Sequence, residues 1–390
     1  MTGPQTGPPA GPAAGRAADN LAWAADLVVS RTIALSTVPA PPHAEQDRAA
    51  MVRGWWAADQ LPEVQLDTAG NVRARLRPGT SGQPAVLVCA HLDTVFGPEV
   101  RHGLTRAGDR LTGPGAGDDT VAVCALSVLD GLLPGGLRHP VWIVATVGEE
   151  GLGNLAGVRA LLADPPGPVR AVIALEGNYL GRVNITGVGS VRWQVTVTAP
   201  GGHAWEDAAA PSAVHEAARL VAGLAALGHP APAPGEATPK TTVNVGRFDG
   251  GESVNSRGRR AEFLVDLRSG DAGALQSLTD AASDVLGTVA PPAGVSVRVI
   301  GERPAGGLDS DHPLATLAAE ALWAAGLTPR LTAASTDANA AYPLGIPALT
   351  LGITTGEGTH TEQEWIDVPP IATGLAALAA TITRADEQEW

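Results

Sequence analysis

The sequence has few of the residues that mark disulfide-stabilised, nucleic-acid-binding or membrane-spanning proteins. Only two cysteines occur in 390 residues, Cys89 and Cys124, which excludes a disulfide framework and a structural zinc finger. Basic residues number 26 against 40 acidic ones, and this balance argues against a nucleic acid or an anionic membrane as partner. No apolar run approaches the roughly 20 residues of a membrane-spanning helix. The first 20 residues lack the basic start and apolar core of a signal peptide, so we expect a cytoplasmic protein.

Glycine and proline are abundant instead, and the chain contains 48 and 32 of them. Together they make about a fifth of the chain, against roughly 12% in average proteins. Hydrophobic residues nevertheless make up 44% of the sequence and fall in long patterned runs, which is enough for a packed core. We therefore expect disorder only in a tail of residues 1–18.

Four short apolar segments have the continuous hydrophobicity of strands that are buried on both faces of a sheet. They span residues 85–90, 141–147, 171–175 and 348–353. Segments with helical apolar spacing lie before, between and after them, at residues 19–35, 46–61, 120–133 and 313–325. Residues 64–77 alternate around Gly70-Asn71, as a β-hairpin does. This pattern predicts an α/β domain made of residues 19–187 and 303–390.

Residues 188–302 have a different pattern, which predicts a second unit inserted into the first. Alternating or apolar segments typical of strands occupy residues 191–198, 241–248, 261–267 and 296–300, and helical segments occupy 211–227 and 272–285. The resulting order, β-α-β-β-α-β, is that of a ferredoxin-like unit.

Residues that commonly ligate metals follow the ends of the apolar segments. The set is His91, Asp93, Asp118, Glu149, Glu150, Glu176 and His360. Ligand sites of open α/β sheets lie outside the carboxyl ends of the strands, so these residues can converge at one edge. Each also has an ordinary structural interpretation, since Asp118-Asp119 can begin a helix and Glu149-Glu150 can be a solvated pair. Their shared placement after strands favours a common site.

The chemistry of this set suits zinc or a similar first-row metal, because it contains two histidines, several carboxylates and no cysteine. The carboxylates suffice for a two-metal site with one bridging carboxylate. The adjacent pair Glu149-Glu150 offers one ligand and one free carboxylate, and a free carboxylate beside a metal-bound water can act as a general base.

From about residue 19 onward the chain resembles the di-zinc peptidase family of aminoacylase-1, acetylornithine deacetylase, succinyl-diaminopimelate desuccinylase, glutamate carboxypeptidase, carnosinase and peptidase T. The resemblance rests on motifs in matching order and spacing: residues 90–95 (AHLDTV), 113–119 (GPGAGDD), 149–151 (EEG), 175–177 (LEG), 201–203 (GGH) and 358–360 (GTH). It implies a zinc-peptidase-like α/β catalytic domain with an inserted ferredoxin-like lid or dimerisation domain.

The resemblance also implies a role for each motif residue. One metal, expected to be Zn²⁺ with Co²⁺ or Mn²⁺ possible, is bound by His91, Glu176 and the bridging Asp118. The second is bound by Asp118, Glu150 and His360. Asp93 orients the imidazole of His91. Glu149 takes a proton from the bridging water and passes it to the leaving amine.

The inserted unit has family motifs of its own. The resemblance implies that His203 reaches the active site across a homodimer, and that Asn255 and Arg268 bind a substrate carboxylate. Without it, Arg268 could simply pair with a neighbouring acid, and Asn255 could be a turn residue. The chain departs from the family at Thr120 and Val121, where a lysine and a glycine are common, and this leaves substrate preference open.

The leading hypothesis is therefore a metal-dependent hydrolase that cleaves an amide bond in a short peptide or N-acyl amino acid with a free carboxylate. Two alternatives remain. The first is a family member used for an amide-forming or cyclising step in small-molecule biosynthesis, and nothing in the sequence favours it. The second is a metal-free binding protein, which the complete set of ligands argues against.

Overall fold

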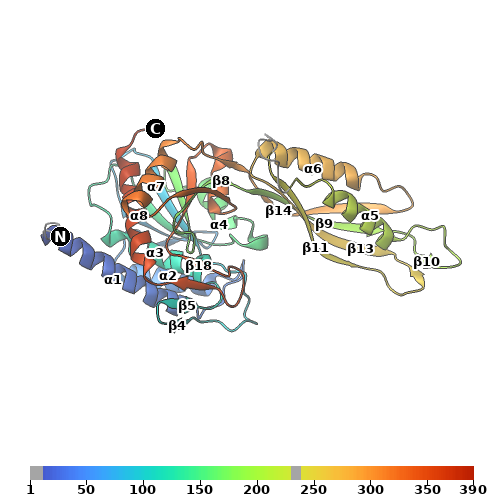
Figure 1. Cartoon of the computed structure of the whole chain (residues 1–390), viewed down its shortest axis with the longest axis horizontal. Helices are drawn as coiled ribbons and strands as arrows, with labels where there is room; N and C mark the ends of the chain where they lie inside the picture. The colour runs from blue at the N-terminus through green and yellow to red at the C-terminus, as the bar shows by residue number, and fades with distance from the viewer. Residues whose placement is uncertain (1–11, 230–238) are drawn as a thin grey trace, which may run out of the picture.

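The computed structural model describes residues 12–229 and 239–390, and the chain forms a larger and a smaller unit along its longest axis (Figure 1). The larger unit contains a nine-stranded sheet in the order β1-β2-β6-β3-β7-β17-β8-β15, with β16 paired to β8. Its strands are β1 (Gln65–Leu66), β2 (Val72–Arg77), β3 (Ala85–His91), β6 (Val141–Thr146), β7 (Val169–Glu176), β8 (Arg182–Gly187), β15 (Gly306–Gly307), β16 (Arg330–Ala334) and β17 (Ala348–Gly352).

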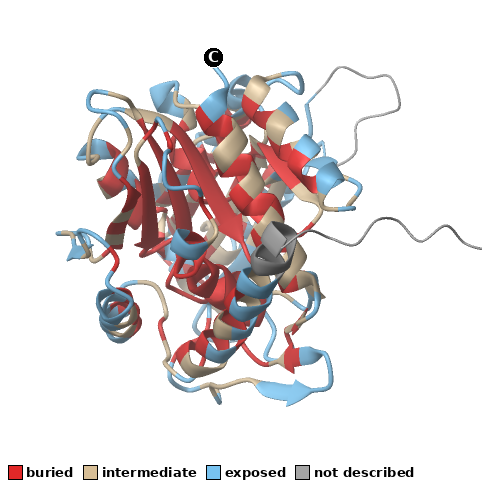
Figure 2. Cartoon of the chain, turned by 90° about the vertical axis from the view of Figure 1, so that its left-hand side faces the viewer, coloured by how far each residue is buried: buried red, intermediate tan, exposed pale blue. Residues whose placement is uncertain are grey.

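The centre of this sheet is parallel, because β6, β3, β7 and β17 run in the same direction. Every residue of β3, β6 and β17 is buried, as their continuous hydrophobicity predicts (Figure 2). The hairpin predicted around Gly70-Asn71 is confirmed as the antiparallel pair β1–β2.

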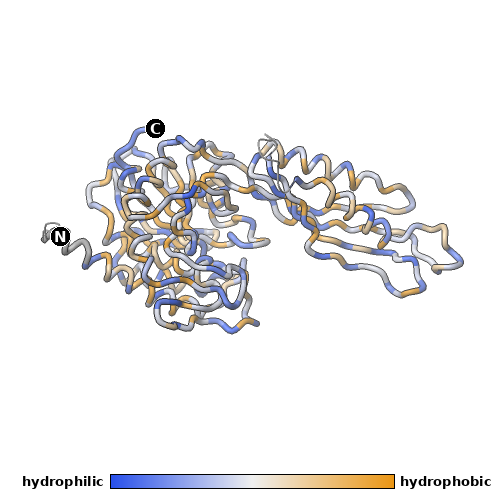
Figure 3. Tube along the Cα trace, viewed as in Figure 1, coloured by the Kyte–Doolittle hydropathy of each residue, from blue (hydrophilic) through white to orange (hydrophobic). Residues whose placement is uncertain are grey.

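Helices cover both faces of the sheet. Alternate residues of the central strands, such as Val88 and Ile173, pack into one large cluster with α1, α2, α3, α7 and α8. The residues between them, such as Leu87 and Val172, pack into a smaller cluster with α4 and the short turn η4. Hydrophobic segments accordingly run through the interior of this unit (Figure 3). The bounds are α1 (Pro12–Leu35), α2 (Gln46–Ala58), α3 (Val121–Leu126), α4 (Ala156–Ala163), α7 (Pro313–Ala324), α8 (Pro370–Glu387) and η4 (Asp337–Ala340).

The smaller unit is a four-stranded antiparallel sheet in the order β11-β13-β9-β14. Its elements are β9 (Gly189–Thr198), α5 (Ala213–Ala225), β11 (Thr241–Gly250), β13 (Arg260–Ser269), α6 (Ala272–Leu286) and β14 (Gly294–Arg303). Inward residues such as Val195 and Phe263 pack against α5 and α6. The chain order and strand order confirm the ferredoxin-like arrangement predicted for this part of the chain.

Two local predictions are corrected. The single helix expected over residues 120–133 is wrong, because α3 ends at Leu126 and a separate short turn, η2, spans Leu129–Gly131. The hydroxyl of Ser127 donates to the carbonyl of Cys124, which competes with continued helix. Helix α1 begins at Pro12, inside the predicted tail, and residues 1–11 lie outside the described residues.

Candidate metal centre

Four of the predicted site residues stand at the carboxyl ends of three neighbouring parallel strands. His91 is the last residue of β3, Glu176 is the last residue of β7, and Glu149 and Glu150 come three and four residues after the end of β6. These strand ends meet at one edge because β3 lies between β6 and β7. The sheet therefore brings together residues that are up to 85 positions apart in the sequence.

Two further residues reach this edge from loops. Asp118 lies in η1 (Ala116–Thr120), a single turn before α3, and η1 packs close to the end of β7. A Cβ atom on Gly177 would lie 2.3 Å from the carbonyl oxygen of Gly117, so this approach requires glycine. His360 lies between the short strands β18 (Gly356–Glu357) and β19 (Trp365–Asp367), with a φ of 66° in the left-handed region.

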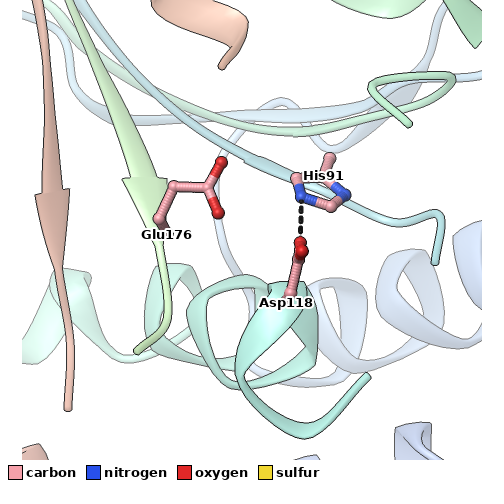
Figure 4. Close-up of side chains that lie close together, drawn as sticks. All are labelled: His91, Asp118 and Glu176. Atoms are coloured by element: carbon pink, nitrogen blue, oxygen red, sulfur yellow. Dashed lines mark ion pairs between the residues drawn. The ribbon is translucent and has the colours of Figure 1, made fainter. Parts of the chain in front are cut away.

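The side chains form two clusters that share Asp118. In the first, ligand atoms of His91, Asp118 and Glu176 lie within 4.8 Å of one another (Figure 4). The second contains Asp118, Glu150 and His360 within the same limit. The Nε2 atom of His360 lies 3.0 Å from Oδ2 of Asp118 and 2.9 Å from Oε1 of Glu150. A cavity of about 500 Å³ opens onto the carboxylates and His360.

His91 has the orientation and hydrogen bonding of a metal ligand. Its Nδ1 atom lies 2.9 Å from the carbonyl oxygen of Asp93, which can accept its proton. In a neutral imidazole the lone pair is then on Nε2. Nε2 is buried, and although Oδ1 of Asp118 is 3.0 Å away, it has no hydrogen-bond partner among the described residues. A cation between Nε2 and the carboxylates would satisfy this atom, so the residues present fit a metal.

The carboxylates of the two clusters are buried close together, which opposes their simultaneous ionisation. Burial raises the pKa of Glu150 to about 7, and burial together with the charge of Asp118 raises the pKa of Glu176 well above its ordinary value. Burial opposes ionisation of Asp118 as well, but His360 and His91 outweigh it and lower its pKa. Contacts with Asp118 and Glu150 raise the pKa of His360 to about 10. This arrangement can hold divalent cations, whose charge would stabilise the ionised carboxylates.

The carboxylate of Asp93 holds the backbone that carries the glutamates. Its two oxygens accept hydrogen bonds from the amides of Glu149 and Glu150, at 3.0 and 2.7 Å. Its Oδ1 atom lies 3.6 Å from Nδ1 of His91, and the closer contact of that imidazole is with the Asp93 carbonyl. Gly148, the residue before Glu149, is held by Glu45, whose Oε1 atom accepts from the amide of Gly148 at 2.9 Å.

Two buried acids that sequence reasoning did not assign to the site organise the ligand backbone. Asp119 accepts from the amides of His91 at 3.1 Å and Gly177 at 2.8 Å, so both of its oxygens are engaged. Glu364 accepts from the amides of Gly117 and Asp118, each at 2.9 Å. Its burial, reinforced by Asp118, raises its pKa to about 8. Adjacency to Asp118 could have pointed to Asp119, but Glu364 carries no sequence signal.

Thr120, which departs from the family pattern, contacts a buried arginine. The Nη1 atom of Arg48, from α2, donates to Oγ1 of Thr120 at 3.2 Å and to the carbonyl of Leu92 at 3.1 Å. Its Nε donates to the carbonyl of Val38 at 2.8 Å. A cation from a distant helix therefore lies beside the position where the family often has lysine.

Arg268 is the one predicted substrate residue of the smaller unit that lines the metal-centre cavity. Its Nε and Nη2 atoms bind the carboxylate of Asp266 at 2.8 to 3.1 Å. Arg192 lines the cavity beside it and lies 3.7 Å from the same carboxylate. Two arginines thus share one acid, which leaves an excess of positive charge on this wall.

His203 and Asn255 lie together at the far end of the smaller unit. His203 is in the ribbon formed by β10 (Gly202–His203) and β12 (Ser256–Arg257), and Asn255 directly precedes β12, where its carbonyl accepts from the amide of Ala204 at 2.9 Å. Neither residue lines the metal-centre cavity of its own chain. Figure 1 shows β10 at the end of the molecule opposite the larger unit.

Comparison with known proteins settles which family has this arrangement. A model described as peptidase family M20/M25/M40 matches residues 87–384. The chain is a member of peptidase family M20/M25/M40. An acetylornithine deacetylase of Proteus mirabilis is 26% identical over 313 residues, covering 76% of this chain and 78% of the relative.

Solved structures have the same fold across nearly the whole chain. A tripeptidase from Staphylococcus aureus superposes with a TM-score of 0.75 at 19% identity, covering 93% of this chain and 99% of the other. A dinuclear metal-binding M20 peptidase from Bacillus subtilis gives 0.67 at 15% identity, covering 94% and 99%. The predicted resemblance and fold class are therefore confirmed.

Membership identifies this M20-family chain as a hydrolase that acts on amide bonds in a metal-dependent reaction. The groups of possible ligand residues described above agree with that requirement. Within the described residues, no helix is long and apolar enough to cross a membrane.

Proposed function

We propose that this M20-family chain hydrolyses an amide bond in a short peptide or N-acyl amino acid with a free carboxylate, as a cytoplasmic homodimer with two Zn²⁺ ions. The observation that carries the proposal is the pair of ligand clusters sharing Asp118, with Glu149 beside them in the same cavity. Histidine and carboxylate ligands suit zinc, and Co²⁺ or Mn²⁺ would serve with similar ligands.

The proposed ligands divide between two sites. His91, Glu176 and Asp118 hold one ion, and Asp118, Glu150 and His360 hold the other. When bound, the ions polarise the scissile carbonyl and stabilise the negative charge that develops on its oxygen. Asp93 keeps His91 and both glutamates in place through the contacts described above.

Glu149 is the proposed general base. Its carboxylate is buried and lies within 4.8 Å of ligand atoms of His91 and Glu150 without belonging to either cluster that shares Asp118. It takes a proton from the attacking water as the water oxygen bonds to the carbonyl carbon. It then gives that proton to the amine as the carbon–nitrogen bond breaks.

Arg268 is the proposed ligand for the substrate carboxylate. A guanidinium suits a planar carboxylate because it can donate two parallel hydrogen bonds. Nε and one N–H of Nη2 are engaged with Asp266, so the edge formed by Nη1 and the second N–H of Nη2 remains for the substrate carboxylate. The second arginine on this wall, Arg192, adds to the attraction.

The position of His203 and Asn255 supports a dimer in which each chain completes the site of the other. Both are exposed at the far end of the smaller unit, away from the cavity that Arg268 lines. Light scattering tests the assembly. Mixing Glu149→Ala with His203→Ala chains tests whether His203 acts in the site of the other chain. In a mixed dimer the site of the His203→Ala chain keeps its own Glu149 and receives an intact His203 from its partner. Activity no higher than that of either variant alone would reject it.

The central test is turnover of dipeptides and N-acyl amino acids by protein treated with chelator and then reconstituted with Zn²⁺, Co²⁺ or Mn²⁺. We expect no turnover after chelation and recovery on adding metal, with about two ions bound per chain at full activity. Matched substrates with an amidated carboxyl group serve as the control for specificity. Metal-loaded protein that cleaves no member of the panel would contradict the proposal.

A further inference from the structure

Arg303 forms a buried ion pair with Glu149, the proposed base. Nη1 of Arg303 lies 2.7 Å from Oε1 of Glu149, and the two side chains are only 4% and 5% exposed. Nη2 of the same guanidinium donates to the backbone carbonyl of Glu149. One arginine thus binds both the side chain and the main chain of one residue.

This double contact restricts the conformation of Glu149. A carboxylate tethered to its own backbone carbonyl through a planar guanidinium has few accessible rotamers. Arg303 is itself held, because Nη1 also donates to Oγ of Ser335 at 3.2 Å. Among the described residues only Arg303 binds Oε1 of Glu149, and Oε2 makes no hydrogen bond. One oxygen is therefore anchored while the other remains available for the proton.

Arg303 lies at the connection between the smaller and the larger unit. It is the last residue of β14, the strand through which the chain leaves the smaller unit for the larger one. Its side chain lines the metal-centre cavity and also a second cavity of about 680 Å³ beside α6 and Tyr342. The residue that holds the base thus belongs to the connection between the two units.

We propose that Arg303 is a positioning residue that sets the orientation of the Glu149 carboxylate for proton transfer. The inference rests on the proposed role of Glu149. A misplacement of about 1 Å in a reacting group can cost roughly a hundredfold in rate. Replacing Arg303 should therefore lower kcat by about 10- to 100-fold, while KM and metal content stay close to wild type.

Arg303→Ala and Arg303→Lys test this inference, with Arg298→Ala as the matched control. Arg298 lies on the same strand but is exposed and binds Gln194. We expect low kcat in Arg303→Ala, partial recovery in Arg303→Lys and wild-type values in Arg298→Ala. Millimolar guanidinium should raise the kcat of Arg303→Ala in a saturable way, because the cavity left beside Glu149 can admit the ion. Circular dichroism and metal analysis verify that each variant is folded and loaded.

Three results would overturn the inference. Unchanged kcat would mean that Glu149 needs no anchor. A raised KM with normal kcat would make Arg303 a substrate ligand instead. A loss of kcat that neither lysine nor guanidinium restores would leave only a structural role. Failure of the proposed function would give different results from failure of this inference. The wild-type protein would then cleave no substrate, or Glu149→Gln would have the same rate as the wild-type protein.

Discussion

The two sheets of the molecule differ in how they are covered, and the difference separates two tasks. The larger sheet is packed with helices on both faces, and its strands β3 and β6 are buried throughout. In the smaller sheet the inward face packs against α5 and α6, no other described helix covers the opposite face, and the edge strand β14 is mostly exposed or half-buried. The proposed metal ligands, which must keep sub-ångström geometry, belong to the larger unit, whereas the residues that would meet substrate or a second chain belong to the smaller one.

The two units also bring opposite charges to one cavity. Acidic residues from the larger unit line one part of the cavity, and the basic wall consists of Arg192, Arg268 and Arg303 from β9, β13 and β14, with Asp266 as the one acid from the smaller unit in the lining. A substrate with a carboxylate can therefore have its charged end on the basic wall and its amide at the acidic one. This separation of roles can be tested by substitutions on each side.

The largest effect is expected from Asp118→Ala, which removes the residue shared by both ligand clusters. Both ions should be lost, and turnover should fall to the uncatalysed rate, because among the described residues Asp118 alone belongs to both ligand clusters. Metal analysis after dialysis and an activity assay measure this. Glu362→Ala is the control, since Glu362 is an exposed acid two residues after His360. Two ions retained by Asp118→Ala would contradict the shared site.

Glu149→Gln should lower kcat by about 10²- to 10⁴-fold, because an amide cannot take a proton from water. Metal content should stay at the wild-type value, since Glu149 belongs to neither cluster that shares Asp118. Steady-state kinetics with metal analysis on the same sample separates this result from that of Asp118→Ala. Equal losses of metal and activity would instead make Glu149 a ligand.

On the basic wall, Arg268→Gln should lower kcat/KM for carboxylated substrates by about 10- to 100-fold, the usual range for a hydrogen bond to a charged group. Amidated substrates should be affected little. Arg260→Gln is the control, because Arg260 lies on the same strand with its side chain 62% exposed. A loss of equal size for both substrate types would remove Arg268 from carboxylate recognition.

The smallest expected effect concerns stability near the acidic wall. Burial, followed by the charge of Glu149, raises the pKa of Asp337 to about 7 from 3.8. Between these values the folded state holds a proton that the unfolded state has released, so stability falls as pH rises through this window. The Tm of wild type should therefore fall relative to that of Asp337→Asn as the pH rises from about 4 to 8.

Chelated protein should be used for this comparison, because bound cations near Glu149 would lower the pKa of Asp337. Asp284→Asn, at an exposed position on α6, is the control and should shift Tm equally at all pH values. A constant difference for Asp337→Asn would mean that Asp337 is ionised throughout.

Much of the fold and the metal-centre geometry follows from local sequence patterns. Continuous apolar segments predict the central strands, and the residues just after them, such as His91 and Glu176, meet because parallel strands share an edge. Contacts between distant segments are not encoded in any local pattern. Glu364 accepts from Gly117, 247 residues away, and Arg303 binds Glu149 across 154 residues. The early end of α3 likewise depends on a hydroxyl–carbonyl bond that helical spacing does not reveal.

The contact between Arg48 and Thr120 constrains how this site could have changed over evolution. A lysine introduced at Thr120, as is common in the family, would bring a second cation against a guanidinium that is already fully buried. We therefore expect the two positions to covary, and on the path from the family's lysine to this chain the lysine is lost before the arginine is gained. Ancestral sequences along this lineage should accordingly pass through an intermediate with neither cation.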